Sequence, residues 1–550
     1  MARGDMQRDQ LAAVAENEKH AKRIVNDIGT RKDTMTIPVA AMLAVLVIPT
    51  VLSGNESDPQ RGAQVRKERQ PTADQGNGFY RNPVLAGNYG DPSVVKVGKD
   101  YYLAKSLGDG FVVWHSCDLV NWRPVTRHTF ADLSGIWAVD LHYLNGRFHL
   151  FMPVGRWPGK TREHYRANFV VHAGKAEGPW SQPHRIDREF IPDDYYTGID
   201  PGFVQTSEGK KFVYTDHGYV MPLSDELIAT DQPKRVYDGW PYPKDWIVEG
   251  FCLESPKLFR RDGWYYLVSA QGGTSGPSTS HMAVVARSKG PTGPWENSPF
   301  NPLIRTYSAS EKWWQQGHAT LVEGPDGQSW WAIYHARLNG CTGIGRQTLL
   351  LPVAWTSDRW PVIKDHAIAG DLLPMPKGGE NVGHGLPLSD DFLSDQLGIQ
   401  WTGSPASLAR LRCGVGSLVM EPGGAEAVSI SLGVPNPGFE ASVQVECSAE
   451  AIAGLCFGSG EGLKTDGTIV SYNKGEKWRT RDTDVPVKNG RCVWLKIRNL
   501  HQDLSFYSSD DGVQWTPFQN GVHAGEYNVQ LFAQGKGRAI FRHFTYLGLE

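Results

Sequence analysis

The chain has 550 residues, and 56 Lys and Arg against 59 Asp and Glu give a formal net charge of −3. Because the body of the chain holds no basic block, nucleic acid is not expected as a partner. Hydrophobic residues make up 40% of the chain and it contains 61 Gly, 35 Pro and 19 Trp, which excludes wholesale disorder and predicts many turns. Seven Cys without a CxxC motif predict neither a disulfide scaffold nor a zinc cluster, although a single pair such as Cys447 with Cys456 stays open.

The N-terminal region contains the one long apolar run. Residues 37–53 (IPVAAMLAVLVIPTVLS) are uncharged and follow Arg31 and Lys32. This length is near the lower limit for a membrane span and somewhat long for the apolar h-region of a signal peptide. We expect residues 1–53 to be a leader that exports the protein to the periplasm or the outside, either cleaved or kept as a membrane anchor. The alternative is a wrongly assigned start before a cytoplasmic enzyme. Residues 54–78 are polar and are predicted to be a linker.

From residue 79 onwards, short strands alternate with tight turns. The segments 93–106 (SVVKVGKDYYLAKS), 141–154 (LHYLNGRFHLFMPV) and 257–270 (KLFRRDGWYYLVSA) each predict a strand, a Gly turn and an aromatic strand. No amphipathic helix of 12 or more residues is expected in this region.

Five of these hairpins begin with a polar residue in a similar position. The five leading residues are Asp91, Asp140, Asp200, Glu254 and His318. They are separated by 49, 60, 54 and 64 residues, close to the repeat length of a β-propeller blade. We therefore predict an all-β fold, with a five-bladed β-propeller over residues 79–368. Equivalent positions of the blades lie near the central axis, so we expect the five side chains to converge on one pocket.

The remaining chain has a different pattern. Residues 369–388 are rich in Gly and Pro and are predicted to be a second linker. Residues 389–550 contain longer alternating strands, such as FEASVQVEC and CVWLKIRNL, which predict a β-sandwich of the jelly-roll kind.

A set of carboxylates around one pocket suits cleavage of a glycosidic bond. This reaction needs one protonated carboxyl, which protonates the leaving oxygen, and one ionised carboxylate, which activates water or attacks carbon. Glu254 has the apolar neighbours Phe251, Leu253 and Leu258, so burial is expected to raise its pKa and favour the acid role. Taken alone, Glu254 could equally be an exposed residue at a strand end.

Further side chains are candidates for contacts with substrate. Asp140 is expected to form a wall of the site, and Trp137 could stack on a sugar ring or pack in the core. Arg346 could bind sugar hydroxyls or keep a carboxylate charged. His318 could be a core histidine, or it could hold a ligand or water on the axis.

As a set, several phrases resemble glycoside hydrolase family 43, whose five-bladed enzymes act on xylosides and arabinosides. They are NPVLAGNYGDPSVVKVGKDYYL, GIWAVDLHYLNGRFHLF, GIDPGFV, LESPKLFRRDGWYYLVSAQGGT, SKGPTGPWENSPFNPL, QGHATLV and GRQTLLLPVAW, which cover roughly residues 79–365. Residues 389–550 resemble the concanavalin-like sandwich that follows the propeller in β-xylosidase-type members.

The resemblance implies roles for individual residues. Asp91 matches the general base, Glu254 the general acid, and Asp200 the residue that orients the acid and tunes its pKa. Trp137 and Arg346 match positions that contact substrate. His318 matches an axial histidine that holds water or a calcium ion in some members, so a structural calcium is conceivable there. The family implies inversion and no required cofactor.

Two departures from the family pattern concern the sugar that is recognised. The segment ESPKL stands where many xylosidases read EGPHL, and Gly90 precedes Asp91 where Pro is common. The predicted function is that of an inverting exo-acting hydrolase releasing xylose or arabinose from plant oligosaccharides. The alternatives are a related enzyme acting on galactan or another furanoside, and a propeller that binds carbohydrate without turnover.

Overall fold

The computed structural model describes residues 72–159, 166–187, 198–458, 460–473, 484–522 and 527–549. Contact clustering divides the chain into Met1–Val65 and Arg66–Glu550, and all described residues belong to the second unit. The predicted leader 1–53 and most of the predicted linker 54–78 lie outside the described residues. Within the described residues, no helix has the length and apolar character needed to cross a membrane.

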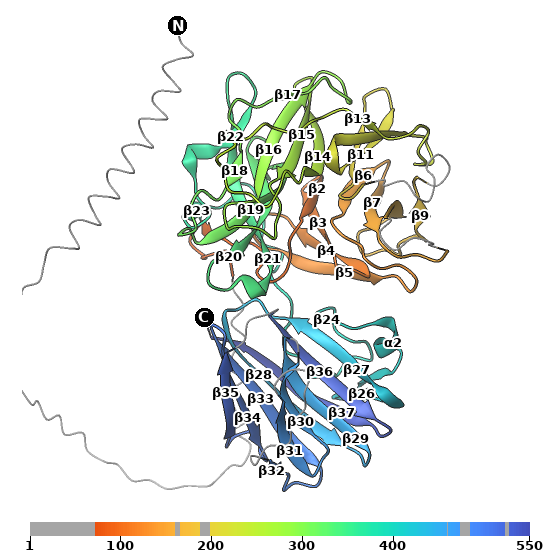
Figure 1. Cartoon of the computed structure of the whole chain (residues 1–550), viewed down its shortest axis with the longest axis vertical. Helices are drawn as coiled ribbons and strands as arrows, with labels where there is room; N and C mark the ends of the chain where they lie inside the picture. The colour runs from red at the N-terminus through yellow and green to blue at the C-terminus, as the bar shows by residue number, and fades with distance from the viewer. Residues whose placement is uncertain are drawn as a thin grey trace, which may run out of the picture. The chain divides into compact units, whose positions relative to one another are not determined.

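Five antiparallel sheets follow one another along the N-terminal two thirds of the described chain, and in each sheet the first four strands pair in chain order (Figure 1). The first sheet contains β2 (Ser93–Val97), β3 (Asp100–Ser106), β4 (Gly110–Ser116) and β5 (Arg123–Thr129). The second contains β6 (Asp140–Leu144), β7 (Arg147–Val154), β8 (Ala167–Ala173) and β9 (His184–Arg185). The third contains β10 (Gly202–Gln205), β11 (Lys211–Thr215), β12 (Tyr219–Leu223) and β13 (Lys234–Arg235).

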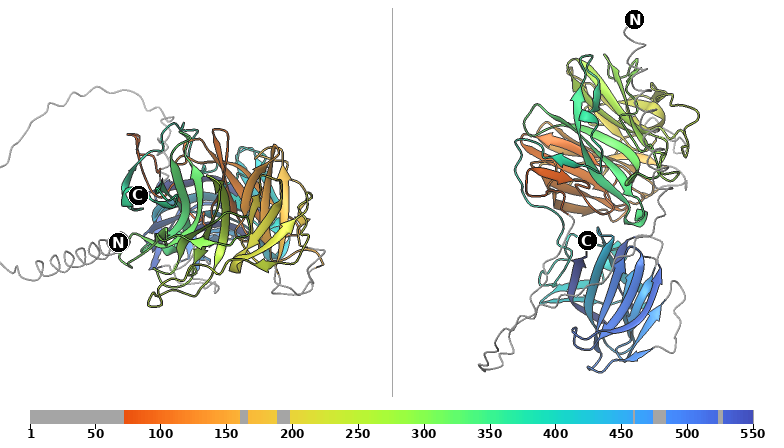
Figure 2. Two further views of the ribbon diagram at one scale, coloured as in Figure 1. Left: turned by 90° about the horizontal axis from the view of Figure 1, so that it is seen from above. Right: turned by 90° about the vertical axis from the view of Figure 1, so that its left-hand side faces the viewer.

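The last two sheets complete the propeller. The fourth contains β14 (Glu254–Arg261), β15 (Trp264–Gln271), β16 (Met282–Ser288), β17 (Glu296–Asn297) and an additional strand, β18 (Ile304–Arg305). The fifth contains β19 (Trp313–Glu323), β20 (Trp330–Leu338), β21 (Arg346–Trp355) and β22 (Pro361–Ile363). Short 3-10 turns lie at η1 (Asp216–Gly218), η2 (Thr342–Ile344) and η3 (Lys364–His366). The predicted five-bladed β-propeller is thus confirmed, and Figure 2 shows its sheets from two further directions.

Local chemistry explains why the predicted hairpins form. The turn between β6 and β7 contains Asn145 and Gly146, and the turn between β14 and β15 contains Asp262 and Gly263. All four residues have positive φ, between 49° and 79°. Asn-Gly and Asp-Gly tolerate this conformation and match the twist of two antiparallel strands, so they favour a tight hairpin.

The two ends of the propeller segment are joined by a separate pair of strands. β1 (Phe79–Arg81) pairs with β23 (Leu372–Pro374), and the hydroxyl of the buried Tyr80 donates to the carbonyl of Leu350 at 3.0 Å. The side chain of Asn82 makes two further hydrogen bonds to the backbone of Leu350. β23 lies inside the stretch 369–388 that the sequence analysis assigns to a linker, because its Gly- and Pro-rich composition hides so short a strand.

The C-terminal part forms the expected sandwich of two antiparallel sheets. One sheet has the order β24 (Trp401–Thr402), β27 (Gly424–Gly433), β36 (Asn528–Gly535), β29 (Ala451–Phe457), β30 (Glu461–Thr465), β31 (Ile469–Asn473) and β32 (Val485–Pro486). The other has the order β25 (Leu411–Gly414), β26 (Ser417–Met420), β37 (Ala539–Gly548), β28 (Gly438–Cys447), β33 (Cys492–Leu500), β34 (Asp503–Ser509) and β35 (Thr516–Val522). A short helix, α2 (Pro405–Leu408), precedes β25.

Alternation along the strands builds the core of the sandwich. In β28, side chains that are fully buried alternate with side chains that are partly exposed, as in a sheet that covers a core with one face. All seven cysteines of the chain lie in the described residues and are free thiols, so Cys447 and Cys456 do not form a disulfide here.

Candidate active site

One pocket of about 390 Å³ receives residues from all five blades or the loops before them. Its lining residues are Asn88, Asp91, Lys105, Ser106, Leu107, Gly108, Ile136, Trp137, Ala138, Ile199, Asp200, Glu254, Thr274, His318 and Arg346. The structure therefore brings together six of the seven residues singled out from the sequence. Asp140 is the exception.

The carboxylates reach the pocket because they stand at the start of the first strand of each blade. Asp91 precedes β2 by two residues, Asp200 precedes β10 by two residues, and Glu254 is the first residue of β14. Asp91 and Asp200 have φ angles of 56° and 53°, in the left-handed region that non-glycine residues seldom adopt. Strained backbone of this kind is often concentrated at functional sites.

Asp91 is surrounded by basic side chains, and its own backbone N–H donates to Nδ1 of His335 at 3.1 Å. The guanidinium of Arg346 lies 2.5 Å from Oδ1 of Asp91, and the Nδ1 atoms of His318 and His335 lie 3.2 Å and 3.1 Å from the same oxygen. Burial alone would raise the pKa of Asp91, but these neighbours outweigh it and hold the pKa well below its ordinary value. Asp91 is therefore ionised over the whole physiological range.

Glu254 and Asp200 have the opposite electrostatic character. Burial raises the pKa of Glu254 well above its ordinary value, and the charges of Asp200 and Asp91 add to the effect. Burial and the charge of Asp91 raise the pKa of Asp200 to about 7. The two groups interact and titrate as a pair, and the pKa values of both are raised. One pocket thus contains a carboxylate that stays ionised and a carboxyl that stays protonated.

The loop that carries Asp200 is held by a second buried carboxylate. Oδ1 of Asp216 accepts a hydrogen bond from the backbone N–H of Ile199 at 3.0 Å, and the N–H of Asp216 donates to the carbonyl of Ile199 at 3.1 Å. A Cβ on Gly198 would lie 2.4 Å from the side chain of Thr215, so this close approach requires glycine. The charge of Asp216 also raises the pKa of Asp200.

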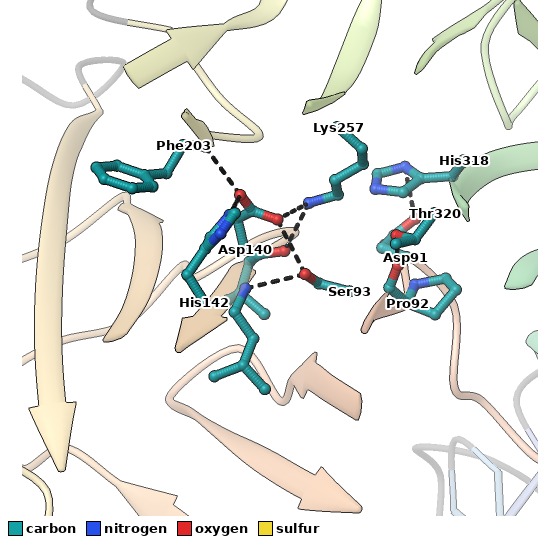
Figure 3. A network of polar contacts seen from close by, with 11 residues as sticks. Asp91, Pro92, Ser93, Asp140, His142, Phe203, Lys257, His318 and Thr320 are labelled. Carbon is teal, nitrogen blue, oxygen red and sulfur yellow. Dashed lines mark hydrogen bonds and ion pairs between the residues drawn. The ribbon is translucent and has the colours of Figure 1, made fainter. Parts of the chain in front are cut away.

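Asp140 lies outside the pocket and joins four blades. Its Oδ1 accepts hydrogen bonds from Ser93 Oγ and Lys257 Nζ, both at 2.9 Å. Its Oδ2 accepts from the backbone N–H of Phe203 at 2.9 Å and lies 2.5 Å from Nε2 of His142. Figure 3 shows these partners, which come from β2, β6, β10 and β14. The expectation that Asp140 forms a wall of the site therefore differs from its position in the structure, because its carboxylate is fully occupied by buried donors.

This network also explains one of the departures from the family pattern. Lys257 is the Lys of the segment ESPKL, and its Nζ bonds to Asp140 and to the carbonyl of Val139. The ion pair is almost completely buried, with 5% of the Lys257 side chain and 4% of the Asp140 side chain exposed. Lys257 does not line the pocket. The Lys at this position therefore affects the contacts between blades and not the lining of the pocket.

Comparison with known proteins agrees with this geometry. The description "Glycosyl hydrolases family 43" belongs to a family model that matches residues 80–361, just over half of the chain. The chain belongs to glycosyl hydrolases family 43.

Curated relatives are similar to a little over half of this chain. A non-reducing end alpha-L-arabinofuranosidase of Bacteroides ovatus is 30% identical over 59% of this chain and 60% of its own length. A xylan 1,3-beta-xylosidase of a Vibrio species is 32% identical over 58% of this chain and 64% of its own length. The chain thus spans less than two thirds of the length of these curated relatives.

A solved structure of family 43 matches a larger part of the chain. The BlXynB protein of Bacillus licheniformis has a TM-score of 0.74 and 27% identity, and the match covers 86% of this chain and all of that one. The combination of a propeller with a sandwich therefore occurs in a known family 43 structure.

His318, which the resemblance to family 43 places on the propeller axis, lies among other groups that could bind a metal ion. His318 is buried, and its Nε2 has no hydrogen-bond partner in the described part of the chain. Potential ligand atoms of Asp91, His318 and His335 lie within 4.8 Å of one another, as do those of Glu254, His281 and His318. Ca²⁺ prefers about six to eight oxygen ligands. Since each group offers two imidazole nitrogens and only one carboxylate, a calcium ion would need water for most of its ligands.

Trp137 is presented to the pocket with one face supported. Its side chain is 49% exposed, and the guanidinium of Arg166 lies 3.4 Å from the centre of the ring. Arg166 is itself fixed by a hydrogen bond to the carbonyl of Gly135 at 2.7 Å. This contact orients the indole, so that its exposed surface is available to a sugar ring.

The sequence analysis missed several residues of the site. His335 contacts Asp91 from β20, and Lys105 lines the pocket from β3. No sequence signal marks His335. Lys105, however, follows the buried Tyr101 and Leu103 at two-residue spacing, which places it on the same face of the strand. A Lys on the buried face of a strand is uncommon, and this signal in the sequence could have identified Lys105 as a candidate.

Proposed function

We propose that this chain is an inverting, exo-acting glycoside hydrolase that releases xylose or arabinose from plant-derived oligosaccharides. The main observation behind the proposal is that one pocket contains both an ionised carboxylate and a protonated carboxyl group. Asp91 is kept ionised by Arg346, while Glu254 is kept protonated by burial and by its acidic neighbours. Inverting hydrolysis needs one base and one acid of this kind.

In the proposed reaction, Asp91 accepts a proton from a water molecule, and the water oxygen attacks the anomeric carbon. Glu254 donates its proton to the leaving oxygen as the glycosidic bond breaks. Asp200 acts on Glu254 through its charge and raises the pKa of the acid. Trp137 offers a ring for stacking against the sugar, and the remaining donors of Arg346 face its hydroxyl groups.

The names of the relatives support the choice of sugar. They include an arabinofuranosidase that acts at non-reducing ends and a xylosidase. A pocket of about 390 Å³ with all three carboxylates in its wall suits a single terminal sugar, which supports exo action. A propeller that only binds carbohydrate would not need two carboxyl groups with opposite pKa shifts.

The test is product analysis by NMR on a screen of nitrophenyl pentosides and hexosides, followed by arabinoxylan. We expect pentosides to be cleaved and the first-formed sugar to have the inverted anomeric configuration. Net retention of configuration would contradict the single displacement, and tight oligosaccharide binding without turnover would favour the binding alternative.

We also propose that the protein is exported, on the basis of the apolar run at residues 37–53. Cell fractionation followed by N-terminal sequencing tests this. Recovery of the full-length chain in the cytoplasm alone would contradict it.

A further inference from the structure

Among the described residues, one cation of the pocket wall makes no direct ion pair. Lys105 is the sixth residue of β3 and lines the same pocket as Asp91 and Arg346. The guanidinium of Arg346 is engaged by Asp91 at 2.5 Å. The ammonium of Lys105, in contrast, has neither a hydrogen bond nor an ion pair with any described residue.

The charges around Lys105 do not remove this imbalance. Burial lowers the pKa of Lys105 to about 8, with Arg346 and Arg127 adding to the effect and Asp91 opposing it. Lys105 is therefore still mainly charged at neutral pH. Glu254 is protonated there, because burial raises its pKa. The ammonium of Lys105 thus has no directly paired acid among the described residues.

Trp137 forms the neighbouring part of the pocket wall. Arg166 covers one face of the Trp137 ring at 3.4 Å. Lys105 and Trp137 are connected through the backbone. The adjacent Ser106 donates from Oγ to the carbonyl of Ile136 at 2.5 Å, and the N–H of Ile136 donates to the carbonyl of Gly108 at 2.8 Å. Lys105 therefore lies close to the indole ring that the pocket presents.

We infer that Lys105 binds the carboxylate of a uronic acid in the substrate. The inference rests on the proposed function, because it assumes that a glycoside occupies the pocket. A partly buried ammonium gains most from an anionic acceptor, since a charged pair forms a stronger hydrogen bond than a neutral hydroxyl does. Two sources of the carboxylate share this chemistry. A glucuronosyl ring is a xylosyl ring with a carboxylate on C5, and it could occupy the pocket itself. Alternatively, a uronic acid attached to the bound pentose could reach Lys105.

The experiment compares matched inhibitors of hydrolysis of an aryl pentoside by the full chain. The first pair is glucose and glucuronate, and the second is glucosyl-xylose and glucuronosyl-xylose with the same linkage. In each pair the two compounds differ at C6, which is a neutral hydroxymethyl group in one and a carboxylate in the other. We expect the acidic member of at least one pair to inhibit at least tenfold more strongly at pH 6. A preference within the first pair indicates a uronic acid in the pocket itself, and a preference within the second pair alone indicates a uronic acid attached to the bound pentose.

Variants connect the preference to Lys105. We expect Lys105→Met to lose the preference for the acidic inhibitor and Lys105→Arg to retain it. Lys99→Met, at an exposed residue of the same hairpin, is the matched control and should leave the preference unchanged. In the wild-type protein the preference should decline as the pH rises past about 8, because Lys105 then loses its proton and its charge. The charged groups that act on Lys105 are Asp91, Arg346 and Arg127.

Equal inhibition by both members of each pair, or a preference that survives Lys105→Met, would overturn the inference. Failure of the proposed function would be seen separately, as absence of hydrolysis of every pentoside. In that case calorimetric titration with the same four compounds still measures whether Lys105 selects a carboxylate.

Discussion

Arg346 and Asp91 are joined across the pocket by a guanidinium–carboxylate contact of 2.5 Å, although 255 residues separate them in the sequence. Arg346 begins β21 in the fifth blade, and Asp91 precedes β2 in the first. This contact connects the last blade to the first and at the same time fixes the charge of the proposed base. Its removal is therefore informative about the mechanism.

Replacing Arg346 with Met should raise the pKa of Asp91, because the cation that lowers it is lost while burial remains. The base would then be protonated at higher pH. We expect the acidic limb of the kcat/KM profile to move upward by about one unit or more. Arg412→Met, at an exposed arginine of the sandwich, is the control. An unchanged acidic limb would remove Arg346 from the control of Asp91.

Asp91→Asn should abolish hydrolysis of every glycoside, regardless of the leaving group. The amide cannot accept the proton of the attacking water, and this step is required for good and poor leaving groups alike. Steady-state rates on an aryl pentoside and on an oligosaccharide measure the effect. A fully active variant would exclude Asp91 as the base.

Glu254→Gln should distinguish between substrates. Poor leaving groups need a proton, so we expect kcat to fall by roughly 10²–10⁴-fold on oligosaccharides. Activated aryl glycosides leave without protonation, and their rates should fall much less. A similar loss on both kinds of substrate would argue against the acid role of Glu254.

Asp200→Asn should lower the pKa of Glu254, because the negative charge of Asp200 raises it. A lower pKa means that the acid loses its proton at lower pH. The alkaline limb of the pH–rate profile should therefore move downward, by about one unit. If the limb stays in place while activity falls, Asp200 acts through geometry alone.

Lys257→Met should destabilise the propeller without removing a group from the pocket. It would leave the carboxylate of Asp140 buried without its cation, which typically costs about 3–5 kcal/mol of unfolding free energy. The double variant Asp140→Asn with Lys257→Met should lose less than the single variant. Chemical denaturation measures both.

Lys234→Met is the matched control for this comparison. It breaks the exposed pair of Lys234 with Asp231, in which the side chains are 69% and 50% exposed, and such pairs contribute about 0–1 kcal/mol. Equal losses for Lys257→Met and Lys234→Met would show that the buried pair has no special role in stability.

The amino-acid sequence alone was enough to predict the fold and four of the polar residues that line the pocket or contact each other there. Strand alternation and Asn-Gly or Asp-Gly turns act over a few residues, so the hairpins at 141–154 and 257–270 could be recognised directly. The repeated polar residue at the start of each blade then placed Asp91, Asp200, Glu254 and His318 near one another.

Only the tertiary structure decided what these side chains do. Asp140 has the same place in its hairpin as Glu254, yet Lys257 from two blades further along the chain reaches it and draws it into a buried network. Asp91 and Glu254 are both carboxyl groups, and their pKa values move in opposite directions. Burial and nearby acids raise the pKa of Glu254, whereas Arg346 and two histidines outweigh burial at Asp91. Burial and charge depend on neighbours that are distant in the sequence, and local patterns therefore contain no record of them.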